Sequence, residues 1–188
     1  MASVTNDHGV FSGLNELHVI AGGFGAGFTV PQGKSLVEVP VAEDSGFSYT
    51  GGTPSVDRYR IHGLSTPWAM KTTPGDTEVN LFVPQVTEAL LKLFGFESVT
   101  AGTSSILSKS WKGVTFKDSA HEVILGLAAV NRTVDQLFGI KYLQGLASLV
   151  FDDANSAKPI GIQLTGSTAS GGDADAIGIF ELDESGND

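Results

Sequence analysis

TEVNLFVPQVTEALLKLFG, residues 77–95, joins the clearest strand pattern of this chain to its clearest helix pattern. The first half has the period of a half-buried strand, with apolar residues alternating at Val79, Leu81 and Val83. Pro84 suits the first turn of a helix, and Gly95 suits the end of one. Between them, one apolar stripe has the spacing of a helix face: Val86, Ala89, Leu90, Leu93 and Phe94. We therefore expect a strand that leads into one main α-helix at about residues 84–94.

Short apolar segments separated by Gly, Ser, Asn and Asp clusters predict strands through most of the remaining chain. They lie at residues 36–41, 56–63, 105–116, 121–130, 141–151, 159–166 and 176–182. Segment 56–63 places Tyr59 and Ile61 on one face and basic residues on the other, which predicts a half-buried strand. Segment 132–139 fits either a short helix or a turn. Because the strands do not alternate with helices, we expect a mainly β fold, a β-sandwich or barrel of about eight strands.

The N-terminal 30 residues differ from the rest in combining many glycines with isolated phenylalanines and no regular period. We expect residues 1–30 to form an extended arm beside a single β-rich domain at 31–188, which would fold without it. Phe11, Phe24 and Phe28 suit a free tail in water poorly, so they should pack on the chain's own domain or on a neighbour. The domain would carry a long loop near 42–54 and an acidic C-terminal end.

The composition excludes several classes of protein. The net charge is −10, of which residues 151–188 supply −7, so the basic footprint of a nucleic-acid binder is missing. The absence of cysteine removes disulfides, thiol nucleophiles and thiolate metal sites. The sequence also lacks the charged and apolar pattern of a signal peptide at its start, and any apolar run of the roughly 20 residues that span a membrane.

Candidate catalytic and ligand-binding motifs fail in detail. The glycines at 22–27 and the GKS at 33–35 lack the spacing of a phosphate-binding loop, and Pro31 interrupts them. The acidic pairs Asp152–Asp153 and Asp173–Asp175 lack the following residues of a calcium loop. No pair spacing links the histidines His8, His18, His62 and His121. We therefore expect no enzyme activity, no cofactor and no metal site.

The arrangement as a whole resembles the tail tube (major tail) proteins of tailed bacteriophages, which are related in fold to the tube protein of type VI secretion. The resemblance rests on the glycine-rich N-terminal arm, the long loop near 42–54, the strand and helix of 77–95, and the distal segments DDANSAKPIGIQLTG and AIGIFELDESGND. It covers most of the chain without an invariant motif.

The resemblance implies a structural virion protein that assembles in the host cytoplasm into stacked, hexameric rings and forms a channel for DNA ejection. Its partners would be further copies of itself and other tail proteins, with DNA passing through without specific binding and no membrane contact. Contacts between subunits would involve the arm and the long loop, at Phe11, Phe24, Phe28, Phe47 and Tyr49. An acidic lumen would repel DNA phosphates, and Glu38 and Glu78 are its favoured lining residues.

Two alternatives remain open. The chain could be another assembly protein, such as a capsid decoration protein or a pilus-like or adhesin-like subunit. Trp68 and Trp111 also allow a carbohydrate-binding module, because tryptophans often form sugar platforms.

Overall fold

A computed structural model describes residues 14–41, 46–60, 62–63, 66–67, 69–73, 75–117, 120–133, 135–150, 160–169 and 176–182. It confirms a mainly β fold, built almost entirely from antiparallel pairs. The strands are β1 (Glu16–Ala21), β2 (Val37–Glu38), β3 (Phe47–Thr50), β4 (Ser55–Tyr59), β5 (Ala69–Thr73), β6 (Glu78–Val83), β7 (Thr100–Ile106), β8 (Lys109–Thr115), β9 (His121–Asn131), β10 (Gln136–Val150), β11 (Gly161–Thr168) and β12 (Ile177–Glu181). The helices are α1 (Glu88–Leu93) and the short 3₁₀ turn η1 (Ala26–Phe28).

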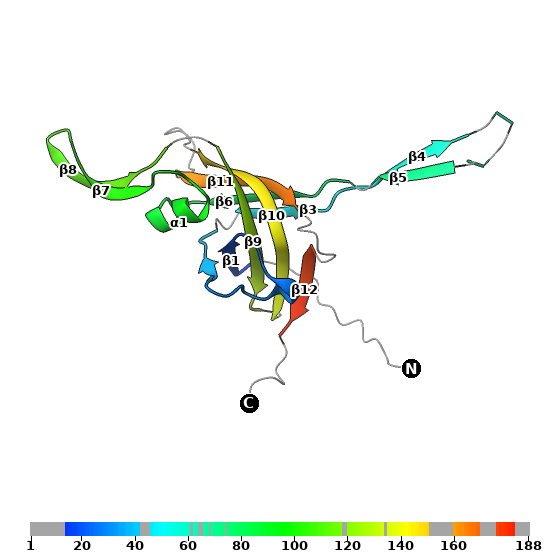
Figure 1. Ribbon diagram of the computed structural model, residues 1–188, viewed down its shortest axis with the longest axis horizontal. Coiled ribbons are helices and arrows are strands. Elements are labelled where there is room, and N and C mark those ends of the chain that lie inside the picture. The colour runs from blue at the N-terminus through cyan, green and yellow to red at the C-terminus, as the bar shows by residue number, and fades with distance from the viewer. Residues whose placement is uncertain are drawn as a thin grey trace.

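One sheet of eight strands forms the body, in the order β2-β1-β9-β10-β11-β6-β3, with β12 beside β10 (Figure 1). The long strand β10 changes partner along its length. Its first part pairs with β12 and its second part with β11, while β9 follows it on the other side. Between the two parts, Lys141 and Tyr142 form a bulge against β9 near Gly126. The bulge divides the sheet into a half that contains β12, β1 and β2 and a half that contains β11, β6 and β3.

The bulge also ties together loops from both halves of the sheet. The Lys141 N–H donates to the Ala176 carbonyl just before β12, and the Lys141 carbonyl accepts from the Phe24 N–H. The Tyr142 carbonyl accepts from the Ala169 N–H just after β11. The extra residue in β10 therefore uses its backbone groups to hold the ends of two neighbouring strands.

The helix is shorter than residues 84–94. It begins after Thr87, whose hydroxyl accepts a 3.3 Å hydrogen bond from the Leu90 N–H and so caps the first turn. Pro84 precedes this cap. The buried face also differs from the predicted stripe, because Leu91 is fully buried and Ala89 is exposed. The helix packs on the core through Leu90, Leu91 and Phe94.

Strand β1 belongs to the body of the fold. Leu17, Val19 and Ile20 are at most 1% exposed, and β1 pairs with β9 along all six of its residues. Part of the expected N-terminal arm is therefore a strand of the main sheet, and a boundary at residue 30 would separate the domain from its own core. Residues 1–13, with Phe11, lie outside the described residues.

Two phenylalanines of the expected arm lie over glycines of the sheet. Phe24 covers Gly126 of β9, where an added Cβ would come within 2.6 Å of the ring. Phe28 covers Gly139 of β10, with a corresponding distance of 2.8 Å. The two rings also contact each other, with centroids 5.9 Å apart. These glycines leave the room that the rings need, so the segment after β1 packs on its own domain.

Two hairpins project from opposite sides of the body (Figure 1). One is formed by β4 and β5 and the other by β7 and β8, and each is a separate two-stranded sheet. Every residue of β4 is exposed, Tyr59 among them, so the prediction of a half-buried strand was wrong there, while Ile61 lies outside the described residues. Segment 105–116, predicted as one strand, is instead the end of β7, a turn and β8. The ambiguous segment 132–139 is a turn followed by the start of β10, and the expected loop 42–54 contains β3.

The Phe24 contact yields a prediction about stability. Replacing Gly126 with alanine should lower the free energy of unfolding by about 1–3 kcal/mol, because the buried ring must move from its place. The same replacement at Gly102 in β7 meets no atom within 4 Å and is the matched control. Urea unfolding of both variants measures the difference. Equal midpoints would show that the phenylalanine packing does not depend on this glycine.

Candidate assembly surfaces

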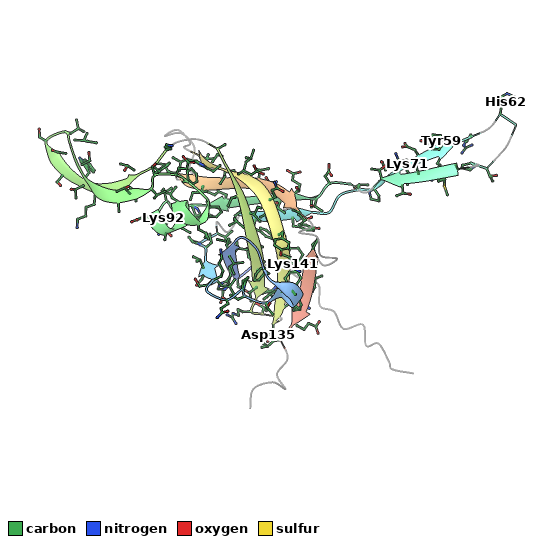
Figure 2. All side chains as sticks on the ribbon, viewed as in Figure 1. Tyr59, His62, Lys71, Lys92, Asp135 and Lys141 are labelled. Atoms are coloured by element: carbon green, nitrogen blue, oxygen red, sulfur yellow. The ribbon has the colours of Figure 1, made fainter. Side chains whose placement is uncertain are left out.

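The projecting hairpins concentrate the positive charge of an acidic protein. Segments 55–73 and 100–115 contain five of the eleven Lys and Arg residues but one of the twenty-one acids: Arg58, Arg60, Lys71, Lys109 and Lys112, against Asp57. Each hairpin thus has a net charge of +2, and the rest of the chain has −14. Figure 2 shows Tyr59 and Lys71 on the β4–β5 hairpin, with His62 at its far end. This separation of charge suits contact between a hairpin of one copy and the body of another.

The β7–β8 hairpin ends in an exposed apolar turn. Leu107 and Ser108 have φ of 56° and 58°, which gives a two-residue turn of the kind that favours Asn-Gly. Leu107 is 83% exposed and its neighbour Ile106 is 57% exposed. Trp111 is half exposed, and its indole N–H donates a 2.8 Å hydrogen bond to the Ile106 carbonyl across the hairpin. A leucine in this conformation costs folding free energy, and little of its surface is buried within the described chain.

An apolar groove lies on the half of the sheet that contains β12. It consists of two adjoining hollows of about 340 and 260 Å³, which share Leu36, Ala128, Leu137 and Phe180 as their floor. Phe180 stacks edge-on against Phe28, with ring centroids 5.1 Å apart. Polar and charged residues line its rim: His18, Arg132, Asp135 and Glu181.

Strand β12 is an open edge beside this groove. It pairs with β10 alone among the described residues, and Ile179 and Leu182 are 71% and 65% exposed. Strands β2 and β3 likewise have one described partner each, β1 and β6. Apolar edge strands of this kind readily pair with a strand of another chain.

A carboxylate network, centred on Glu16, lies on the β1 side of the groove. Arg132 donates from Nε and Nη2 to the two carboxylate oxygens of Glu16, both at 2.9 Å. His18 lies 3.2 Å from the same carboxylate. The hydrogen bonds from Arg132 and then from His18 lower the pKa of Glu16 from 4.5 to about 2. Glu16 therefore stays ionised at neutral pH and holds Arg132 beside the rim.

A polar face covers the other half of the sheet. Its exposed or half-exposed polar positions alternate with core residues along five strands: Ser48, Thr50, Glu78, Asn80, Glu122, Gln144, Thr165 and Ser167. The same face carries two exposed apolar residues, Ile124 opposite Gln144 and Leu146 opposite Glu122. Asn80 donates a 2.9 Å hydrogen bond to Glu78 and accepts a 3.1 Å hydrogen bond from Thr165. Gln144 donates to Glu122. These eight positions include two carboxylates and no lysine or arginine.

The residues predicted to form subunit contacts or to line a lumen lie in different parts of the structure. Phe24 is 5% exposed and Phe28 is half-buried, and both pack on the sheet. Phe47 and Tyr49 lie on edge strand β3, half-buried, with Tyr49 5.2 Å from Phe138 between ring centroids. Glu78 lies on the polar face, whereas Glu38 lies on edge strand β2, opposite His18. The interface and lumen roles of these residues stay predictions.

Sequence reasoning missed the β7–β8 hairpin as a feature. The segment 100–115 has no Asn-Gly or Asp-Gly turn to mark it, and its alternating residues are mostly Ser, Thr, Gly and Lys. The structural observation that reveals it is exposure, because all of β7 and most of β8 face solvent.

In the described part of the chain, no group of three His, Asp or Glu side chains is placed to hold a metal ion. The described residues include no helix long and apolar enough to cross a membrane. Trp68 lies outside them.

No family model and no curated protein sequence matches this chain. Among solved structures, the chain is similar to a chain in the cryo-EM structure of the anti-feeding prophage baseplate, described as six-fold symmetrised. The identity is 11% and the TM-score 0.41, over 92% of this chain and 96% of that one.

The carboxylate network yields a prediction about pH. Because the folded-state pKa of Glu16 is about 2, below its ordinary 4.5, its contribution to stability is present above pH 4.5 and is lost as pH falls toward 2. Replacing Arg132 with glutamine should raise the Glu16 pKa toward 4.5, as measured by NMR titration of its carboxyl carbon. Lys92→Gln, which breaks the separate Lys92–Glu88 pair, is the control and should leave Glu16 unchanged. An unshifted Glu16 pKa in Arg132→Gln would exclude this pairing in solution.

Proposed function

We propose that this chain is a structural, non-enzymatic subunit of a phage-tail-like particle, in which copies assemble into stacked rings that form a tube. The observation that carries the proposal is the pair of exposed, basic hairpins on an otherwise acidic body. An isolated two-stranded hairpin is marginally stable in water, so two of them in one chain are best explained by partners that complete them.

The open edges support assembly through the backbone as well. Strands β12, β2 and β3 leave unpaired backbone groups among the described residues, and β12 is apolar on its exposed side. Pairing of such edges between copies satisfies these groups and extends the sheet from one subunit to the next. A ring is one closed arrangement that removes every edge of this kind.

The polar face supports the role of a channel lining. Most of its side chains are small hydroxyls and amides, with the exposed apolar residues Ile124 and Leu146 among them, and its Glu78 and Glu122 carboxylates repel phosphates. On this proposal DNA passes along the face without specific binding, which its lack of lysine and arginine favours. The proposal also places the protein in the virion tail, with further copies and other tail proteins as its partners.

Electron microscopy tests the proposal directly. Negative staining of the purified protein at high concentration should show rings or tubes with a central opening of about the width of DNA. A protein that stays monomeric and binds sugars would instead favour the carbohydrate-binding alternative.

The charge distribution yields a further prediction for the same assay. Lys71→Glu in the β4–β5 hairpin should raise the protein concentration needed for assembly, because it removes positive charge from the contact. Lys92→Glu on α1 changes the net charge equally but lies on the body, so it should have a smaller effect. Analytical ultracentrifugation at low and high salt measures both variants. Equal effects would mean that net charge, and not the hairpin, controls assembly.

A further inference from the structure

The tip of the β7–β8 hairpin and the groove beside β12 are complementary in chemistry. We propose that the apolar tip, Ile106 and Leu107, of one copy docks into the groove floored by Leu36, Ala128, Leu137 and Phe180 of a second copy. This inference rests on the proposed function and specifies one of the contacts that assembly requires.

The charges around the two surfaces are opposite. Lys109 pairs with Ile106 at the tip, Lys112 lies farther along the same strand opposite Thr103, and segment 100–115 contains no acid. The groove rim carries Asp135 and Glu181, while its one arginine, Arg132, is bound to Glu16. A basic tip entering an acidic rim places each charge near an opposite one, which favours this orientation over its reverse.

The conformation of the tip indicates a docking role. A two-residue turn with positive φ at both positions favours Asn-Gly, yet the chain has Leu107 and Ser108 there. Asparagine would adopt this conformation more easily than leucine. The leucine is thus a cost to the isolated hairpin and a gain only where another surface covers it.

The arrangement in space makes the contact intermolecular. The β7–β8 hairpin points away from the body, whereas the groove lies by β12 and by Asp135 at another end of it (Figures 1 and 2). A tip and a groove on different parts of one chain give a head-to-tail contact. In such a contact, one docked copy still has an open groove and the other an open tip, so further copies can add.

One variant separates docking from folding. Leu107→Asn should keep or raise the melting temperature, because asparagine suits the turn, and should raise the concentration needed for assembly about tenfold, because the apolar contact is lost. Thr103→Asn on the stem of the same hairpin is the control and should leave assembly unchanged. If Leu107→Asn assembles like the unmodified protein, the docking proposal is wrong.

Cross-linking identifies the groove as the partner. Because the chain has no cysteine, Leu107→Cys protein can be mixed with Leu36→Cys protein and treated with a short bifunctional thiol reagent. We expect a joined pair of chains well above the yield with Thr165→Cys, which lies on the polar face. A yield no higher than this control, in material that assembles, overturns the inference and leaves the proposed function standing.

The remaining outcomes distinguish the two proposals. Cross-linked oligomers without rings or tubes would support the docking contact and contradict the tube. A protein that stays monomeric and gives no cross-link would contradict both. Binding to anionic vesicles that Leu107→Asn abolishes, with assembly unchanged, would show that the tip contacts lipid and would overturn the inference.

Discussion

The β-bulge at Lys141 and Tyr142 is the constraint on which the rest of this fold depends. By inserting one residue into β10 opposite β9, it lets a single long strand serve β12 in one half of the sheet and β11 in the other. One half then presents the apolar groove and the open edge of β12, and the other presents the polar face. Without the bulge, these surfaces would belong to one continuous ladder with one set of neighbours.

The glycines around the bulge serve the same arrangement. Gly126 and Gly139 leave space above β9 and β10 that Phe24 and Phe28 fill, and Phe28 in turn supports Phe180 beside the groove. The high glycine content of the chain therefore reflects close packing of aromatic rings on a sheet as well as turns. Because the groove depends on stacked rings and backbone contacts, the packing of the core also maintains the shape of the groove.

Elements with a regular spacing of apolar residues could be predicted from the sequence. Features without such a spacing could not. Strand β6 and the helix after it were predictable, because alternating valines and leucines and a helical stripe have different periods. The start of the helix was predicted at Pro84, because proline suits a first helical turn, whereas the cap is Thr87. Strand β1 was not predicted, because glycines lie close to it in the sequence. Strand β4 was predicted as half-buried because Tyr59 and Ile61 alternate with basic residues, although β4 lies outside the body. The tip at Leu107 and its groove depend on exposure and three-dimensional placement, which no local pattern encodes.

The narrow base of the β4–β5 hairpin has a consequence for how the molecule unfolds. Gly52 and Gly75 lie so close there that neither has room for a side chain, and almost every described residue beyond them faces water. Such a hairpin shares little of the cooperative core and can open on its own while the sheet stays intact. Its amide protons should then exchange with solvent far faster than those of β9 and β10. A partner that covers the hairpin would slow this exchange. The exchange rate of the hairpin amides therefore indicates whether the subunit is alone or assembled.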